Sequence, residues 1–75
     1  MNNVKDLEYI KRFGINLKQI RISKKISQEI LAYSADIPIS QVGRIERGEI
    51  NTTISTVKAL ANALNILVKD LFEFD

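Results

Sequence analysis

Two short helical segments separated by only three residues constrain this chain more than any other feature of its sequence. Ser27 is a favourable N-cap for a helix over residues 28–35. Asp36-Ile37-Pro38 then interrupts the helical pattern, because proline disfavours the α conformation in the residue before it. A second helix is predicted over residues 39–47, ending at Gly48, a residue suited to the position after a helix. Two helices joined by so tight a turn have the spacing of a helix-turn-helix.

The segments on either side of this pair are also helical in pattern. Apolar residues recur at helical spacing before it (Ile10, Phe13, Leu17, Ile20) and after it (Ile54, Val57, Leu60, Ala61, Leu64). Gly14 falls inside the first pattern, so that this segment is either one helix or a short lead-in helix within residues 1–12 followed by the main one. A threonine cap precedes the fourth helix and Asn65 ends it. With a last short helix from Val68 to about Phe72, we predict one all-α domain of five helices over residues 1–75.

Length and composition exclude several classes of protein. The chain has 75 residues and contains neither cysteine nor histidine, so thiolate zinc sites and the usual neutral-pH acid–base group are missing. We therefore expect no metal, no cofactor and no enzymatic activity. No apolar run approaches the roughly 20 residues that span a bilayer, and the first ten residues carry charges where a signal peptide would be apolar. We expect a cytoplasmic protein with no membrane partner.

Charge is unevenly distributed along the chain. Residues 1–48 hold nine basic and five acidic groups, a net charge of +4, whereas residues 49–75 have a net charge of −2. A basic front and an acidic tail fit an anionic partner on one side, although a solvated face of mixed charge would look similar.

A detailed string of residues goes beyond this generic pattern. It consists of Leu17, Arg21, Ser27-Gln28-Glu29, Leu31-Ala32, Ile37, Val42, Arg44-Ile45-Glu46-Arg47-Gly48, Ala61, Ala63-Leu64 and Asp70-Leu71-Phe72. The string resembles the Cro/CI-type helix-turn-helix family of phage and bacterial transcriptional regulators, over about three quarters of the chain. The resemblance implies a five-helix, lambda-repressor-like DNA-binding domain whose second and third helices form the helix-turn-helix.

Three positions depart from the family pattern. Asp36 stands where the family has a turn glycine, Pro38 where a capping Ser or Thr is usual, and Thr52 where a proline often precedes the fourth helix. Asp tolerates the left-handed conformation. We expect these departures to affect local stability more than DNA recognition.

The third helix offers a small and basic outer face. Val42, Ile45 and Glu46 are predicted to point inward, leaving Ser40, Gly43, Arg44 and Arg47 outside. Arg44 could donate two parallel hydrogen bonds to guanine O6 and N7 in a major groove about 12 Å wide. The resemblance places base contacts at the start of this helix, here Ile39, Ser40 and Gln41, with Arg44 one turn on. A solvated basic face is the alternative.

Backbone phosphates would be bound beside this helix. Gln28, with Ser27, lies at a helix N-terminus whose free N–H groups suit an anion, and Arg47 adds a cation. Asn51, Thr52 and Thr53 could bind the phosphate backbone further along or could only cap the fourth helix; the sequence leaves these two readings open.

Arg21 and Glu46 both lie beside apolar faces of their helices. In the family, an Arg and a Glu at these positions pair across the first and third helices. Such a pair adds little net stability but is costly to break, so its predicted role is to orient the recognition helix.

The C-terminal segment, residues 66–75, holds apolar groups beyond those that a four-helix core needs. Ile66, Val68 and Leu71 fit core positions, whereas Leu67, Phe72 and Phe74 are predicted to form a homodimer interface. The alternative is that these three pack back onto Val4, Leu7 and Ile10.

The sequence favours a regulator that binds a palindromic double-stranded DNA operator as a homodimer. An antitoxin or a restriction–modification controller would use the same domain, with a toxin or RNA polymerase as a further partner. A protein-interaction bundle without DNA binding is the alternative of another class, and it would carry an acidic or apolar outer face on the third helix.

Overall fold

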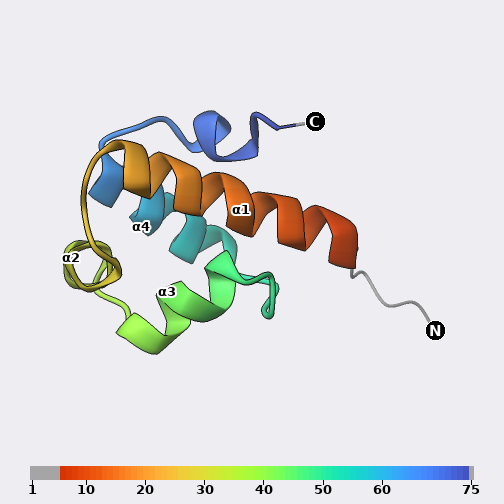
Figure 1. The fold of residues 1–75 in the computed structure, drawn as a ribbon, viewed down its shortest axis with the longest axis horizontal. Coiled ribbons are helices and arrows are strands. Elements are labelled where there is room, and N and C mark those ends of the chain that lie inside the picture. The colour runs from red at the N-terminus through yellow and green to blue at the C-terminus, as the bar shows by residue number, and fades with distance from the viewer. Residues whose placement is uncertain (1–5, 75) are drawn as a thin grey trace.

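The computed structural model describes residues 6–74, which fold into helices with no strand among them. The elements are α1 (Leu7–Ser23), α2 (Gln28–Ala35), α3 (Ile39–Glu46), α4 (Ile54–Leu64) and η1 (Val68–Phe72). Figure 1 shows α1 lying across the molecule, with α2 and α3 on one side of it and η1 on the other. The all-α prediction is confirmed with one correction to the count. The fifth element, η1, is a 3₁₀ helix, so the described chain has four α-helices.

Local capping explains where these helices begin and end. Ser27 and Thr53 accept hydrogen bonds from the backbone N–H groups of Ile30 and Thr56, as N-caps do. Asp36 and Gly48 take left-handed conformations, with φ of 59° and 73°, after α2 and α3. Pro38 precedes α3 without a side-chain cap. The helix boundaries predicted for the helix-turn-helix are therefore confirmed to within one residue.

One continuous helix spans the first pattern, and Gly14 lies inside it. Gly14 is buried against the last turn of α3, where a Cβ would lie only 2.7 Å from the carbonyl oxygen of Glu46 and closer still to that of Ile45. Glycine here lets α1 and α3 approach closely, so no lead-in helix separates from the main one in residues 7–23.

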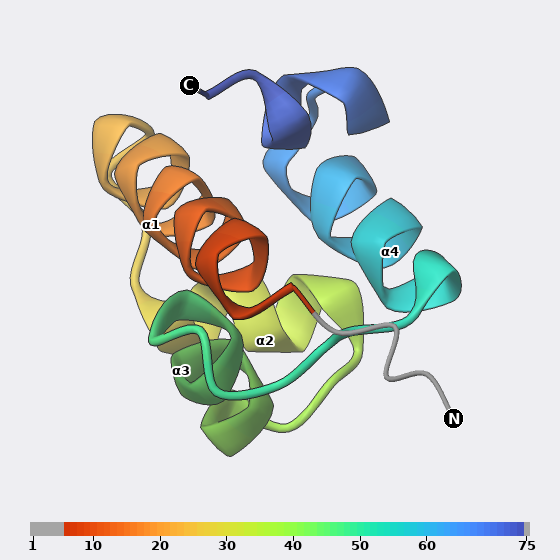
Figure 2. The same cartoon turned by 90° about the vertical axis from the view of Figure 1, so that its right-hand side faces the viewer.

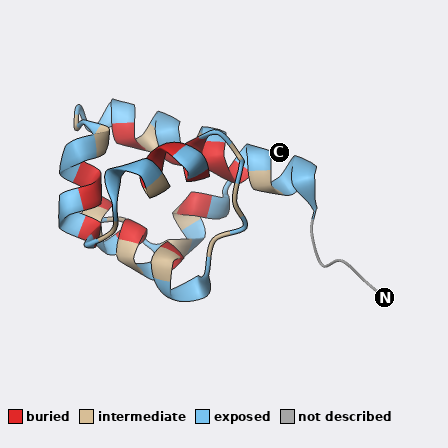
Figure 3. Ribbon diagram, turned by 90° about the horizontal axis from the view of Figure 1, so that it is seen from below, coloured by how far each residue is buried: buried red, intermediate tan, exposed pale blue. Residues whose placement is uncertain are grey.

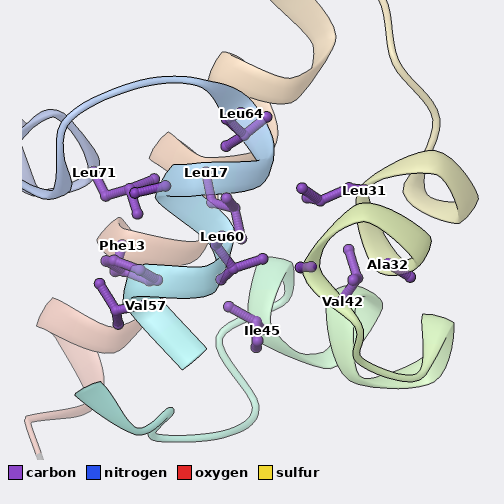
Figure 4. Packing of buried hydrophobic residues seen from close by; sticks show 12 residues of the cluster. Phe13, Leu17, Leu31, Ala32, Val42, Ile45, Val57, Leu60, Leu64 and Leu71 are labelled. Atoms are coloured by element: carbon purple, nitrogen blue, oxygen red, sulfur yellow. The ribbon is translucent and has the colours of Figure 1, made fainter. Parts of the chain in front are cut away.

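The core lies between α1, α2, α3 and α4 and extends to η1 (Figures 3 and 4). Its fully buried side chains come from all five elements: Leu17, Leu31, Val42, Ile45, Leu60, Leu64 and Leu71. Figure 2 shows α2 and α3 together at one end of the α1–α4 pair. The prediction that Ile54 belongs to the apolar face of α4 is wrong, because its side chain is 89% exposed.

A long-range hydrogen bond pair attaches η1 to the rest of the domain. Asn16 of α1 donates through Nδ2 to the carbonyl oxygens of Asp70 and Leu71, at 3.1 and 2.9 Å. The side chain of Leu71 is fully buried and belongs to the hydrophobic core. The sequence pattern did not predict this role for Asn16. Among the described residues, none of the helices has the length and hydropathy needed to cross a membrane.

Candidate nucleic-acid interface

The outer face of α3 points to solvent because the opposite face of the helix is packed against the core. Val42 and Ile45 are 0% and 1% exposed, which fixes the rotation of the helix about its axis. Ile39, Ser40 and Arg44 are exposed and Gln41 is half-buried. The four predicted base-contact residues therefore lie along the first turns of one helix, with their backbone held by the core behind them.

Gly43 is buried rather than exposed, which corrects its predicted place on the outer face. The reason is the side chain of Arg47: a Cβ built on Gly43 would lie 2.9 Å from Arg47 Nη1 and 3.8 Å from Gln28 Nε2. The guanidinium of Arg47 thus lies over the part of α3 that Gly43 leaves free. The missing side chain of Gly43 therefore leaves room for the guanidinium of Arg47 to lie against α3.

A buried ion pair joins α1 to the end of α3. Arg21 donates through Nε to Glu46 Oε2 at 2.6 Å and through Nη2 to Glu46 Oε1 at 3.1 Å, with side chains 10% and 2% exposed. Arg21 Nη1 also donates to the carbonyl oxygen of Ile26 at 2.9 Å. The pair predicted from the sequence is thus formed with bidentate geometry, and each of the three guanidinium nitrogens of Arg21 donates one hydrogen bond.

Gln28 belongs to the same network. Its Nε2 donates to Glu46 Oε1 at 2.9 Å, so Glu46 receives hydrogen bonds from two other elements, α1 and α2. This contact places the Gln28 amide beside the recognition helix. The bond uses one of the two N–H donors of the amide, so the second N–H and the free backbone N–H groups of the first turn of α2 remain as donors for an anion.

The three predicted phosphate contacts in the loop after α3 lie in different environments. Asn51 is exposed. The hydroxyl oxygen of Thr52 is buried and has no hydrogen-bond partner in the described chain. Thr53 caps α4, and its hydroxyl also donates to Thr56 Oγ1 at 3.0 Å. The sequence left open whether these three residues cap the fourth helix or bind phosphate. Of the three, Thr53 alone caps α4.

Glu49 is a residue beside the outer face of α3 that the sequence pattern did not single out. Its carboxylate accepts from Arg47 Nε at 2.8 Å and lies 3.8 Å from Arg44 Nε. The hydrogen bond to Arg47 lowers the pKa of Glu49 below its ordinary value, and the same contact raises the pKa of Arg47. The signal available in the sequence was an acidic residue two positions after a basic one, which is too common to single out.

The three residues predicted to form a dimer interface differ in their surroundings. Leu67 is 63% exposed. Phe72 packs against Tyr9 and Phe13 with ring centroids 6.3 and 5.0 Å apart, and Phe74 packs against Tyr9 at 5.1 Å. The two phenylalanines thus pack back onto α1 within their own chain, through the rings of Tyr9 and Phe13, and Ile10 lines the same groove as Phe72. Val4, also named as a partner, lies outside the described residues.

An apolar groove of about 500 Å³ lies beside these aromatic rings. Its lining comes from the first half of α1, the loop before α4, the start of α4 and η1: Tyr9, Ile10, Phe13, Ile50, Asn51, Thr52, Ile54, Val57, Lys58, Val68 and Phe72. Ile54, at its rim, is almost fully exposed. The described chain therefore has an uncovered apolar surface that is separate from the outer face of α3.

A family model described as helix-turn-helix matches residues 17–71 of the chain. Among curated proteins, the control protein C.BamHI of Bacillus amyloliquefaciens is 38% identical over 63 residues, which cover 83% of this chain and 78% of that protein. The immunity repressor protein of Bacillus phage phi105 is 40% identical over 55 residues, covering 73% of this chain and 38% of the repressor.

A solved structure is similar over most of both chains. The restriction-modification controller protein C.AhdI from Aeromonas hydrophila has a TM-score of 0.83 and 38% sequence identity, and the match covers 84% of this chain and 96% of that one. The overall fold described above is therefore shared with that solved structure.

Proposed function

Because this chain belongs to the helix-turn-helix family of DNA-binding transcriptional regulators, we propose that it reads a palindromic operator as a homodimer, placing α3 in the major groove. The observation that carries this proposal is the outer face of α3. It exposes Ile39, Ser40 and Arg44 on a helix whose opposite face is completely buried. A rigid helix with short side chains near its start and an arginine one turn on fits a groove that presents guanine acceptors.

Each base-contact residue has a distinct chemical part in this proposal. Ile39, nearly half exposed at the start of α3, offers an apolar contact to a thymine methyl group. Ser40 and Gln41 can donate to or accept from a base edge. Arg44 has a side chain 55% exposed and donates to guanine O6 and N7. The buried contact of Glu46 with Arg21 and Gln28 holds this face in register with α1 and α2.

The proposed phosphate contacts surround α3. Ser27 accepts a hydrogen bond from the Ile30 N–H, so its own O–H is available to a phosphate. The backbone N–H groups beside Gln28, the guanidinium of Arg47 and the exposed amide of Asn51 supply further donors. Thr53 and Thr52 complete the predicted set, although the hydroxyl of Thr52 is buried and must move to reach DNA.

The proposed homodimer uses the surface around Leu67 and the part of the apolar groove lined by Val68 and Phe72, but not the part lined by Asn51 and Thr52. Leu67 and Ile54 are exposed, and an apolar groove of about 500 Å³ lies beside Phe72; exposed apolar surface of this kind marks interaction sites. A second copy covering this surface would join two recognition helices on one rigid body. Two half-sites about 34–36 Å apart on one side of the duplex are what such a dimer reads.

Control of a restriction–modification system is the specific role that the relatives favour. C.BamHI is named a control protein, and C.AhdI is described as a restriction-modification controller. The phage phi105 relative is named an immunity repressor, which favours repression of a phage-type operator instead. Restriction and modification genes beside the gene for this chain would support the first role, and lysogeny genes the second.

Footprinting tests the proposal directly. The purified chain is titrated onto the DNA upstream of its own gene, with Arg44→Ala as the matched variant. We expect protection of an inverted repeat by the wild type and loss of that protection in the variant at the same concentration. Absence of a footprint on this DNA, together with no binding to any duplex at low salt, would reject the proposal in favour of a protein-interaction bundle.

A further inference from the structure

One carboxylate lies between the two basic residues of the α3 outer face. Arg47 donates to Glu49 from two nitrogens, Nε to Oε2 at 2.8 Å and Nη2 to Oε1 at 3.4 Å. Arg44 Nε lies 3.8 Å from the same Oε1. Both arginines that the proposed function assigns to DNA are therefore close to a single anion of the protein itself.

The turn after α3 holds Glu49 in this place. Gly48 is left-handed, its N–H donates to the carbonyl oxygen of Ile45 at 3.0 Å, and the N–H of Glu49 donates to that of Arg44 at 2.9 Å. These two backbone bonds form the Schellman motif that folds a chain back over the end of a helix. The position of Glu49 is therefore set by the backbone and does not depend on its side chain.

The guanidinium of Arg47 is positioned by its contact with Gly43 of α3. Its Nη1 lies over Gly43, where a Cβ would be 2.9 Å away. The Nε–Nη2 edge of the guanidinium, which is the edge that binds a carboxylate or a phosphate with two parallel hydrogen bonds, already holds Glu49. A DNA phosphate approaching that edge meets a filled site.

We propose that Glu49 sets the DNA affinity of this surface by competing with backbone phosphates for Arg47. This inference rests on the proposed function, because it takes duplex DNA as the partner. In the free protein the carboxylate holds the guanidinium against Gly43. On binding, a phosphate replaces the carboxylate at the same edge, and Glu49 is left beside the DNA as a repelling charge.

The size and sign of the effect follow from the exposure of the pair. The side chains of Arg47 and Glu49 are 59% and 47% exposed, so the contact is weak enough for a phosphate to break. Its loss and the added repulsion together correspond to about a two- to fivefold reduction in DNA affinity. Because phosphates carry no sequence information, the reduction applies to operator and random duplexes alike.

Glu49→Gln tests this competition, with Glu73→Gln as the matched control. Glu73 is also exposed and paired, with Lys69 Nζ 4.0 Å from its Oε2, but it follows η1 rather than α3. Affinity for an operator and for a random duplex is measured between about 50 and 200 mM salt. We expect Glu49→Gln to bind both duplexes about two- to fivefold more tightly at the lowest salt, with a gain that shrinks as salt rises, and Glu73→Gln to change binding much less.

A double variant separates competition for Arg47 from a general change in charge. In an Arg47→Gln background the gain from Glu49→Gln should largely disappear. An equal gain in that background, or binding by Glu49→Gln no tighter than by the wild type, would overturn the proposal. The Nε–H signal of Arg47 in the NMR spectrum of the free protein gives a readout without DNA. It should shift in Glu49→Gln, and an unchanged signal would show that the pair is not formed.

The proposed function and this inference fail in different ways. Wild-type protein that binds neither duplex at low salt would overturn the proposed function and this inference with it. Wild-type protein that binds DNA, with no gain in Glu49→Gln, would overturn this inference alone.

Discussion

Gly14 of α1 lies directly against the carbonyl oxygen of Ile45 in the last turn of α3, with no room between them for a Cβ. The contact joins the longest helix to the C-terminal end of α3. Because the three nearest atoms all belong to the backbone of Ile45 and Glu46 in α3, they cannot move aside as a flexible side chain would.

Gly14→Ala should therefore destabilise the domain by about 1–3 kcal/mol, the cost typical of overpacking a core, although alanine is the better helix former. Gly43→Ala is the matched control, since the added methyl group would meet mainly the movable end of Arg47. Urea unfolding followed by circular dichroism measures both. A Gly14→Ala protein as stable as the wild type would mean that α1 and α3 are further apart than the structure has them.

Removing one partner of the buried Arg21–Glu46 pair should destabilise the fold strongly, whereas replacing both by apolar residues should destabilise it much less. Arg21→Ala leaves the Glu46 carboxylate buried with Gln28 as its remaining side-chain partner, and we expect a loss of about 3–5 kcal/mol. The double variant Arg21→Met, Glu46→Leu removes both charges and should recover much of that loss.

The same thermal or urea unfolding experiment compares the single and double variants. If the double variant is as unstable as Arg21→Ala, the stranded charge is not the cause of the loss. DNA binding by the folded double variant then tests whether the pair orients α3. Recovery of stability without recovery of operator affinity is the result expected of a positioning role.

Arg44→Ala should remove sequence discrimination more than overall affinity. Base-edge hydrogen bonds carry specificity, so the variant should lose about 1–3 kcal/mol on the operator and little on random DNA. Equilibrium binding to both duplexes at one salt concentration measures the difference. Equal losses on the two duplexes would make Arg44 a phosphate contact.

Leu67 gives the cleanest test of the proposed homodimer. Phe72 and Phe74 also pack on Tyr9 within the chain, so their replacement would disturb the fold and the interface together. Leu67→Ser, at a position 63% exposed, should leave the fold intact and give a monomer with weaker operator binding and nearly unchanged half-site binding.

Sedimentation measures the mass of the Leu67→Ser variant, and circular dichroism shows whether it is folded. A wild-type chain that sediments as a monomer at tens of micromolar, and protects two half-sites independently, would contradict the homodimer. Weaker half-site binding by Leu67→Ser would instead indicate that the substitution disturbs α3.

The sequence by itself determined the ends of α2, α3 and α4, because the interactions that set them are local, whereas it left open whether α1 is one helix or two. Ser27 and Thr53 cap the residues three positions on, and Gly48 ends α3 through its own left-handed backbone. The inward faces of α2 and α3 followed from the 3.6-residue period of their apolar residues. The family resemblance added the pairing of Arg21 with Glu46, which joins residues 25 positions apart.

Only the tertiary structure decided which surfaces these helices leave open. Gly43 is covered because Arg47 folds back over it, and Ile54 is exposed although it continues an apolar pattern. Asn16 acquires its role from carbonyl oxygens more than fifty residues away. Glu49 becomes a neighbour of Arg44 and Arg47 through the turn that follows α3. A periodic pattern records which side of a helix is apolar, but the contact partner of each side chain depends on how the helices pack, and that packing is set by the whole core at once.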